Sequence, residues 1–308
     1  MIKALFTEAR PKQWAKNVLV FAAPGAAGML THRTALLHAV VIFVAFCMAS
    51  AGTYYWNDIL DVEADRVHAT KRVRPIASGA VPLGVARVVG TILLVGGPAL
   101  AFATRWQGGL ACVVYVVLTS TYSKVWKHIA VVDLIAVAAG FVVRAVAGAA
   151  ATDVPMSSWF VLCTSFGSLF IVTGKRYAEL REMGEAGDGP TPVRATLEAY
   201  SLGFLRVVLS VSCCATLVSY CVWAFEGKVV SEKSGATTLA LSNTVAHSNA
   251  LVFYQLSIVP MLTALLRYLL ILEQGHGAAP EEIFAADRTL QVLGLLWIAV
   301  FATGVYMS

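Results

Sequence analysis

Charged residues are scarce in this chain. Asp, Glu, Lys and Arg make up only 13% of its 308 residues, whereas a soluble globular domain usually has about 25%. Hydrophobic residues reach 58%, and the mean hydropathy is +0.73. These values exclude an ordinary soluble protein. They predict an all-α, polytopic protein of the membrane bilayer, and we expect no nucleic-acid partner.

The chain also lacks the motifs of several common enzyme classes. It has no Walker A loop, no Rossmann glycine motif, no H-E-x-x-H motif and no G-x-S-x-G motif. Its six cysteines lie in apolar runs and form no C-x-x-C pair, which predicts small core side chains rather than disulfides or metal ligands. Any chemistry must therefore come from the few carboxylates and basic side chains.

Long apolar segments are abundant. A spanning helix needs roughly 20 mostly apolar residues. Nine segments approach this length: 17–31, 35–56, 83–104, 108–123, 129–150, 156–174, 202–225, 248–272 and 289–306. The first is broken by Pro24 and Gly25, and we expect a kink at Pro260 in the eighth. The sequence thus predicts nine transmembrane helices in a single domain, residues 1–308.

The basic residues are unevenly distributed among the connections. Of the 23 Lys and Arg residues, 18 lie in alternate connections, and the opposite set holds only Arg33, Arg105, Lys228 and Lys233. By the positive-inside rule the first set is cytoplasmic. Nine spans then place the N-terminus in the cytoplasm and the C-terminus outside. The polar motifs share the basic side, so we expect an active site that faces the cytoplasm from the cell (inner or plasma) membrane.

Four oxygen-bearing side chains follow the second apolar segment at helical spacing: Asn57, Asp58, Asp61 and Asp65. Residues three or four apart share a helix face, so all four can point into one cavity. Mg²⁺ prefers oxygen ligands and often bridges carboxylates to substrate phosphates. The spacing therefore predicts a Mg²⁺ site that binds a phosphorylated ligand. The alternative is a solvated helix end whose charges pair with nearby basic residues.

Two basic groups accompany the carboxylates. Lys71 and Arg72, with Arg74, come directly after them, and Lys124 and Lys127 form a second pair. Arg and Lys both bind phosphate oxygens, Arg through its fork and Lys as a point charge. We expect these residues to bind substrate phosphates. The alternative is that they only anchor the chain at the membrane surface.

Two ionisable residues lie inside a predicted span. Asp133 and Arg144 are eleven residues apart, which places them on one helix face. Ionisable residues at membrane depth are functional candidates by default, so we predict that both bind substrate. Mutual neutralisation through neighbouring helices is the alternative.

A third cluster lies between Gly174 and Glu182. Its candidate site residues are Lys175, Arg176, Tyr177, Glu179 and Glu182. Lys175, Glu179 and Glu182 form one helical stripe, which a salt-bridged helix end would also show. The predicted position at the same membrane face as the aspartates favours a functional role.

The N-terminal segment is basic and aromatic. Lys12 and Lys16 flank Trp14, and such a segment is typical of the lipid headgroup region. The alternative is that the two lysines help to bind an anionic lipid substrate.

The motif Asn57-Asp58-x-x-Asp61-x-x-x-Asp65, followed by Lys71-Arg-x-Arg-Pro-Ile-Ala-Ser-Gly79, resembles the first signature of the UbiA superfamily of intramembrane prenyltransferases. Tyr122-Ser123-x-x-x-Lys127 ahead of Asp133 fits the same pattern. The resemblance covers nearly the whole chain in helix count and motif order. It implies nine transmembrane helices around a central cavity, with Mg²⁺ and a diphosphate held at the cytoplasmic end.

One difference from typical members of the superfamily indicates a particular branch of it. Typical aromatic prenyltransferases of this superfamily have a second aspartate-rich motif after the sixth span, where this chain has Gly174-Lys-Arg-Tyr-Ala-Glu-Leu-Arg-Glu182. Together with Arg10-Pro-Lys-Gln-Trp-x-Lys-Asn17, this resembles the decaprenyl-phosphate phosphoribosyltransferase branch. That branch implies Mg²⁺-dependent transfer of phosphoribose from phosphoribosyl diphosphate to decaprenyl (polyprenyl) phosphate, an early step towards cell-wall arabinan.

The resemblance also implies roles for the candidate residues. Asn57, Asp58, Asp61 and Asp65 would hold Mg²⁺ on the diphosphate, and the basic groups at 71–72 and 124–127 would neutralise the leaving group. The cluster at 175–182 would position the 5-phosphate and ribose. A prenyltransferase with an aromatic or haem acceptor is the alternative within the superfamily, and an ion-coupled transporter is the alternative outside it. A homo-oligomer is compatible with all three.

Overall fold

The computed structural model describes residues 1–68, 70–185, 195–226, 250–275 and 280–307, and over these ranges the chain is helical with no strand. Seven of its helices are long and apolar enough to cross a membrane. This confirms the prediction of an all-α, multi-pass membrane protein. The predicted number of nine spans is not confirmed, and the orientation of the termini stays a prediction.

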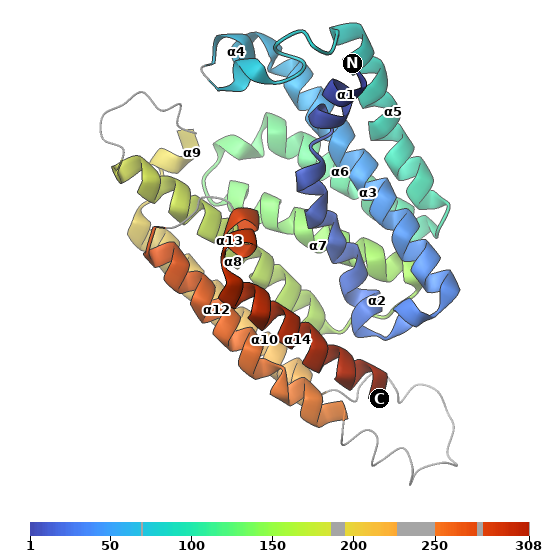
Figure 1. Cartoon of the computed structure of the whole chain (residues 1–308), viewed down its shortest axis with the longest axis vertical. Helices are drawn as coiled ribbons and strands as arrows, with labels where there is room; N and C mark the ends of the chain where they lie inside the picture. The colour runs from blue at the N-terminus through green and yellow to red at the C-terminus, as the bar shows by residue number, and fades with distance from the viewer. Residues whose placement is uncertain (69, 186–194, 227–249, 276–279, 308) are drawn as a thin grey trace. The chain divides into compact units, whose positions relative to one another are not determined.

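The chain divides into two compact units, each described here by itself (Figure 1). Unit 1 comprises Met1–Trp126 with Gly140–Pro155, and unit 2 comprises Lys127–Ala139 with Met156–Ser308. Helix α7 (Val132–Thr152) contributes its first residues to unit 2 and the remainder to unit 1. Whether the chain is one catalytic domain stays a prediction.

Unit 1 is a helical assembly built on one long helix. Its elements are α1 (Ile2–Glu8), η1 (Pro11–Phe21), α2 (Ala22–Ala26), η2 (Met29–Thr31), α3 (Arg33–Leu60), α4 (Val62–Val67), η3 (Lys71–Val73), α5 (Leu83–Phe102) and α6 (Trp106–Lys124). Helices α3 and α5 lie side by side (Figure 1). A Cβ on Gly52 would lie 2.5 Å from the backbone nitrogen of Leu94, so glycine permits this close packing. Small residues commonly drive helix association in membranes.

The first predicted span differs from the structure. Residues 17–31 form the end of the 3₁₀ segment η1, the five-residue helix α2 and the turn η2, and no single long helix. Gly28 adopts φ +68°, a left-handed conformation that interrupts a helix. The predicted span 108–123 does correspond to α6, but polar residues at both of its ends keep it outside the seven most apolar helices.

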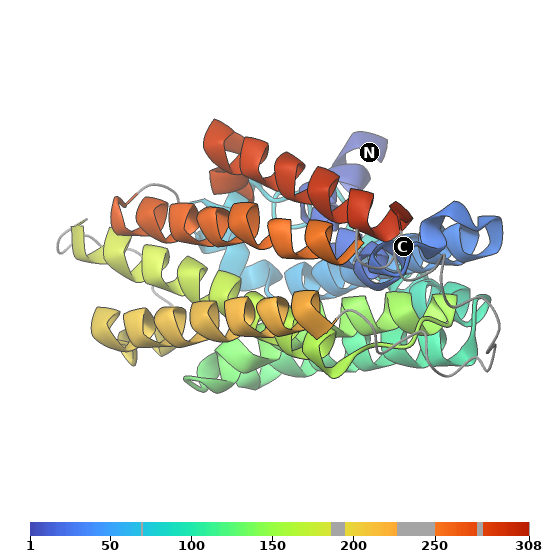
Figure 2. The same cartoon turned by 90° about the horizontal axis from the view of Figure 1, so that it is seen from below.

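Unit 2 is a bundle of longer helices. Its elements are α8 (Ser158–Glu185), α9 (Ala195–Glu198), α10 (Leu202–Glu226), α12 (Ile258–Glu273), α13 (Pro280–Ala286) and α14 (Arg288–Met307). Helix α8 packs along α10, and α12 packs along α14, as Figures 1 and 2 show. An aromatic cluster of Trp223, Tyr254 and Phe301 binds α10 to α14, with ring centroids 5.2 to 5.8 Å apart.

The predicted kink in the eighth span lies three residues before Pro260. Residues 250–256 are helical, Ser257 is a turn, and α12 begins at Ile258. Proline is well tolerated in the first turn of a helix because the amide it lacks has no partner there. The chain therefore begins a new helix just ahead of Pro260.

Candidate active site

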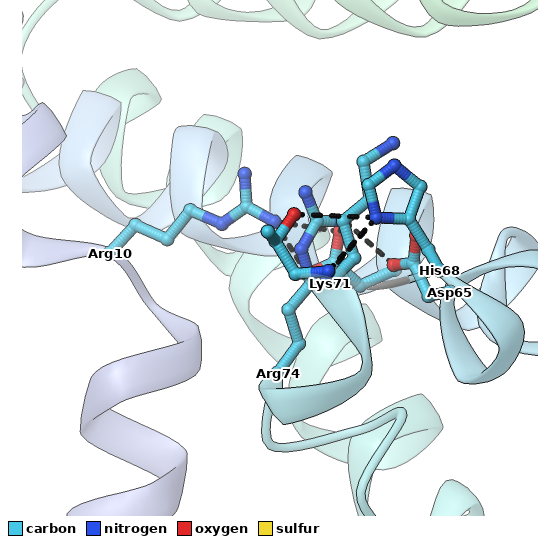
Figure 3. Close-up of polar contacts among 7 residues, drawn as sticks. Arg10, Asp65, His68, Lys71 and Arg74 are labelled. Carbon is cyan, nitrogen blue, oxygen red and sulfur yellow. Dashed lines mark hydrogen bonds and ion pairs between the residues drawn. The ribbon is translucent and has the colours of Figure 1, made fainter. Parts of the chain in front are cut away.

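Two of the predicted aspartates lie together and buried at the end of α3. Asp58 is 4% exposed and Asp65, on α4, is 2% exposed. The guanidinium of Arg74 bridges them, with Nη1 3.1 Å from Asp58 Oδ1 and 2.7 Å from Asp65 Oδ2. Figure 3 shows Arg74 extending from the segment after η3 towards Asp65. Buried carboxylates are costly without a counter-charge, and this arginine supplies one to both.

A second arginine, Arg10, reaches Asp58 from the N-terminal segment; Figure 3 shows its side chain extending towards Arg74. Arg10 Nη2 lies 2.7 Å from Asp58 Oδ1 and 2.5 Å from Oδ2. Its guanidinium also lies 4.9 Å from the centre of the Tyr54 ring. The backbone of Arg10 has φ +50°, which is rare for a residue other than glycine. Such strain persists only where the surroundings enforce it, and it is concentrated at functional sites.

The remaining residues of the motif diverge from this pair. Helix α3 ends at Leu60, and Asp61 forms the turn before α4, with φ −92° and ψ 5°. Asp61 is exposed, and Asn57 is half-buried one helical turn before it. Within the described ranges, no three Asp, Glu, His or Cys side chains lie close enough together to hold a metal ion. The structure therefore pairs Asp58 with Asp65, and the inclusion of Asn57 and Asp61 stays a prediction.

A further carboxyl group lies beside Asp58. Glu8, the last residue of α1, is 1% exposed, and among the residues that the structure describes neither of its carboxyl oxygens has a hydrogen-bond partner of good geometry. Burial, and then the neighbouring Asp58, raise the pKa of Glu8 to about 8. Glu8 is therefore largely protonated at neutral pH, which limits the negative charge in this region.

Most of the basic residues of unit 1 that were predicted to bind substrate or lipid are accessible. Lys71, Arg72, Lys12 and Lys124 are exposed, and Lys16 is half-buried, with Nζ 2.5 Å from Gln13 Oε1. The turn that carries Lys71 is organised by His68. Its Nδ1 accepts hydrogen bonds from the backbone N–H groups of Thr70 (3.2 Å) and Lys71 (3.3 Å).

Arg144 lies in the interior of unit 1, where neutral groups surround it. The side chain is 6% exposed. It donates to Asn17 Oδ1 (2.7 Å), to the carbonyl of Gly140 (2.7 Å) and to Tyr115 Oη (2.9 Å). Asn17, which belongs to η1, is fully buried and donates to Ser50 Oγ (3.4 Å) on α3. Arg144 therefore ties η1 to α6 and α7, and its predicted contact with substrate stays untested.

The contact between η1 and α7 is unusually close. A Cβ on Gly148 would lie 1.8 Å from the carbonyl oxygen of Val20, which is a collision. Eleven residues is long for a 3₁₀ helix, whose hydrogen-bond geometry is poorer than that of an α-helix. Contacts from α7 thus stabilise the segment that carries Arg10 at its N-terminal end.

In unit 2, Asp133 and Arg176 form a buried ion pair. Asp133 is 1% exposed, and Arg176 Nε lies 3.3 Å from its Oδ2. Arg176 Nη1 lies 2.8 Å from Glu179 Oε2, and Lys175 Nζ lies 3.9 Å from the other oxygen of Glu179. Four of the predicted residues are thus brought together in one network. Glu182, one turn further along α8, is exposed.

Tyr200 completes this network. Its hydroxyl donates to Asp133 Oδ1 and accepts from the backbone N–H of Val131, both at 2.5 Å. Val131 has φ +69°, a strained conformation for a β-branched residue. Lys127 lies in the same connection, and its carbonyl accepts from Thr196 at 3.2 Å. Burial and the adjacent Asp133 raise the pKa of Tyr200, so it remains a neutral hydrogen-bond donor.

Tyr177 lies apart from that network. Its hydroxyl donates to Glu273 on α12 (3.0 Å) and accepts from Arg206 on α10 (3.1 Å). The motif Gly174–Glu182 therefore presents two faces, one towards Asp133 and one towards α10 and α12.

Sequence reasoning assigned no site role to Arg10, Glu8 or Tyr200, and it expected Arg74 to bind phosphate rather than to pair with the aspartates. Arg10 lies within a quoted motif and could have been included. Glu8 and Tyr200 carry no signal in spacing, because only tertiary folding brings them to Asp58 and Asp133.

Comparisons with known proteins agree with the motifs. Residues 18–286 match the model of the UbiA prenyltransferase family. A decaprenyl-phosphate phosphoribosyltransferase of Corynebacterium glutamicum is 40% identical over all of this chain and 87% of its own length. Proteins of the same name from Mycolicibacterium smegmatis (37% identical, 100% and 94% covered) and Mycobacterium tuberculosis (39%, 96% and 92%) are also similar.

Solved structures agree with the fold. A UbiA homolog from Archaeoglobus fulgidus bound to Cd²⁺ superimposes with a TM-score of 0.69 at 16% identity, over 98% of this chain and 99% of that one. The same homolog bound to GPP and Mg²⁺ gives a TM-score of 0.64 at 18% identity, with the same coverage.

Proposed function

Because the chain belongs to the UbiA prenyltransferase family, we propose that it is a membrane pentosyltransferase. It moves phosphoribose from phosphoribosyl diphosphate to decaprenyl phosphate or a similar polyprenyl phosphate, and releases diphosphate. Full-length similarity to proteins named for this activity, at 37–40% identity, supports the reaction. We further propose that the site faces the cytoplasm from the plasma membrane, as the basic connections predict.

The observation that carries this proposal is the pairing of Asp58 and Asp65 with Arg10 and Arg74. The two buried carboxylates can bind a cation, and the two arginines beside them can bind a polyanion that contacts this cation. The carboxylates of Asp58 and Asp65 match the oxygen ligands that Mg²⁺ prefers, so these two residues fit the ion, and Asp61 and Asn57 are kept as predicted further donors. Bound Mg²⁺ would neutralise charge on the diphosphate.

The reaction needs little proton chemistry from the protein. The bond between C1 of the ribose and the diphosphate oxygen breaks, and diphosphate leaves with the electron pair. An oxygen of the lipid phosphate forms the new bond to C1. The nucleophile is already an anion, so no strong general base is required.

Basic side chains of the protein hold positive charge near the diphosphate leaving group. With the carboxylates holding the cation, Arg10 and Arg74 would be able to donate to diphosphate oxygens, and Lys71, Arg72, Lys124 and Lys127 would add positive charge for the leaving group. Preorganised charge of this kind usually makes the largest single contribution to the rate enhancement. We retain the predicted role of Lys175, Arg176, Tyr177, Glu179 and Glu182 in binding the 5-phosphate and the ribose.

The test uses purified full-length protein with Mg²⁺, phosphoribosyl diphosphate and a polyprenyl phosphate. We expect diphosphate release only when both substrates are present. Release that requires a prenyl diphosphate and ignores phosphoribosyl diphosphate would favour a prenyltransferase and contradict the proposal.

A further inference from the structure

One short segment of unit 2 is hydrogen-bonded to both ends of the connection that leads into α7. The segment is 196–200, which begins within α9, and the connection is 127–131, which begins in the 3₁₀ turn η4 (Trp126–His128). Thr196 Oγ1 donates to the carbonyl of Lys127 at 3.2 Å, and the backbone N–H of Val131 donates to Tyr200 Oη at 2.5 Å. The segment therefore fixes the path of the connection at two points.

Val131 shows that this path is imposed on the connection. Its φ of +69° is strained for a β-branched residue. The Val131 side chain is 47% exposed, so its own packing offsets little of the strain. The short hydrogen bond to Tyr200 acts directly on the strained backbone. Strain of this kind persists only where the surroundings enforce it, and it is concentrated at functional sites.

Tyr200 is well placed to enforce the conformation, because its own position is fixed. The residue is 7% exposed, and its ring stacks on Phe204 with the centroids 5.8 Å apart. Its hydroxyl also donates to Asp133 Oδ1 at 2.5 Å, and Asp133 is held by its ion pair with Arg176. One hydroxyl group thus joins the connection to the first turn of α7.

Lys127 is the cation whose position depends on this connection. Arg176, the other cation linked to Tyr200, is 4% exposed and already paired with Asp133 and Glu179. Lys127 is half-buried, and its ammonium group makes no ion pair with any residue that the structure describes. A partly desolvated ammonium without a counter-charge favours an anionic ligand.

We propose that Tyr200 is a positioning residue, which holds the connection 127–131 in the conformation that presents Lys127 to the diphosphate of the donor. Thr196 supports it at the other end of the connection. The inference rests on the proposed function, in which Lys127 adds positive charge for the leaving group. Tyr200 acts through Lys127, because a change in the sign of φ at Val131 would redirect the chain on which Lys127 lies.

The first test is Tyr200→Phe, which removes the hydroxyl and keeps the ring. Steady-state transfer is measured with purified full-length protein, Mg²⁺, phosphoribosyl diphosphate and a polyprenyl phosphate. We expect Y200F to raise the KM for phosphoribosyl diphosphate about tenfold, because a small displacement of a binding group has effects of this size. The contact exists in the bound substrate, so its loss appears in KM. The KM for polyprenyl phosphate should not change.

Tyr220→Phe is the matched control. Tyr220 is also a buried tyrosine, and its hydroxyl contacts Ser257 (2.6 Å) and Trp297 (2.8 Å) near the other end of α10. Y220F therefore loses as many hydrogen bonds as Y200F, and it should keep both KM values. A wild-type KM for phosphoribosyl diphosphate in Y200F, or an equal rise in both KM values, would overturn the proposal.

Val131→Gly provides a rescue that a purely stabilising role of Tyr200 does not predict. Glycine adopts positive φ without a steric penalty, so the connection no longer needs the tyrosine hydroxyl to hold it. The double variant V131G/Y200F should recover most of the KM that Y200F loses. A double variant with a KM as high as that of Y200F would contradict the proposal.

Lys127→Ala shows whether the effect passes through Lys127. K127A should raise the KM for phosphoribosyl diphosphate by itself, and adding Y200F should cause no further rise, because two changes that remove one contact are not additive. A full additional rise would overturn the proposal. If the wild type does not use phosphoribosyl diphosphate, the proposed function fails and this inference falls with it. If it does, and Y200F behaves like the wild type, only the role of Tyr200 fails.

Discussion

Arg10 and Asp58 are 48 residues apart in sequence, and the arginine reaches both oxygens of the buried carboxylate. The contact joins the N-terminal segment to the end of α3. It holds an arginine in a left-handed backbone conformation at the point where α1 gives way to η1. The N-terminus of this protein is therefore part of the candidate active site rather than only a membrane anchor.

Arg10→Ala should impair both stability and activity. Removing one partner of a buried ion pair typically lowers the free energy of unfolding by about 3–5 kcal/mol. The Arg10 side chain is 32% exposed, so solvent weakens the pair, and we expect the free energy of unfolding to fall by about 1–3 kcal/mol. Thermal unfolding in detergent measures the loss. Arg87→Gln, on the exposed face of α5, is the control and should unfold like the wild type.

Asp58→Ala should reduce turnover by at least about 10²-fold, as does removal of one preorganised electrostatic group in other enzymes. The measurement is diphosphate release at limiting Mg²⁺ concentration. Asp287→Asn, which changes a carboxylate outside both candidate sites, should retain activity. Turnover of D58A at the wild-type rate would remove Asp58 from the mechanism.

Glu8 should make the protein less stable as the pH rises. Its pKa is about 8 in the folded protein and about 4.5 when unfolded, so the unfolded chain loses its proton first. This contribution to stability is greatest below pH 4.5, falls between pH 4.5 and 8, and is constant above pH 8.

Glu8→Gln removes this dependence. We expect E8Q to be more stable than the wild type at pH 8 by at least about 1 kcal/mol, which corresponds to less than one pKa unit. Melting temperatures across pH 5–9 provide the measurement. Glu63→Gln, an exposed carboxylate paired with Arg66, should follow the wild-type curve. Parallel curves for E8Q and the wild type would show that Glu8 titrates normally.

Arg144→Met should destabilise unit 1 by about 2–4 kcal/mol. The substitution leaves Asn17, Tyr115 and the carbonyl of Gly140 without their donor, and each unsatisfied buried group costs about 1–3 kcal/mol, offset in part by relief of a buried charge. Unfolding measurements test this. Tyr115→Phe removes only one of the three contacts and should cost about 1 kcal/mol. If R144M is as stable as the wild type, the hydrogen bonds of Arg144 do not stabilise the packing of η1 against α6 and α7.

The sequence predicted the helical membrane fold and the separate clusters, because hydropathy and helical spacing are local properties. It put all four side chains of the motif on one face. The structure brings two of them, Asp58 and Asp65, together through Arg74, and hydrogen bonds from Asp61 to Asn57 and from Asp65 to Asp61 continue the helical path through the turn. It failed at residues 17–31, where apolar composition resembled a span but glycine and the contact with Gly148 favour shorter elements.

The pairing of side chains was largely beyond prediction. Arg176 is neutralised by Asp133, 43 residues away, and Arg144 donates a hydrogen bond to the amide oxygen of Asn17, 127 residues away. Spacing on one helix carries no information about such partners. Tyr177 shows the same limit, because its neighbours in sequence face Asp133 while its own hydroxyl faces α10 and α12.

The most direct test of the central claim is the mass of the lipid product. Purified protein is incubated with Mg²⁺, phosphoribosyl diphosphate and decaprenyl phosphate, and the extracted lipids are analysed by mass spectrometry. The account predicts a lipid heavier than the acceptor by one phosphoribosyl group, formed only in the presence of both substrates. An unchanged acceptor, alongside a prenylated product when a prenyl diphosphate and an aromatic acceptor are supplied instead, would contradict it.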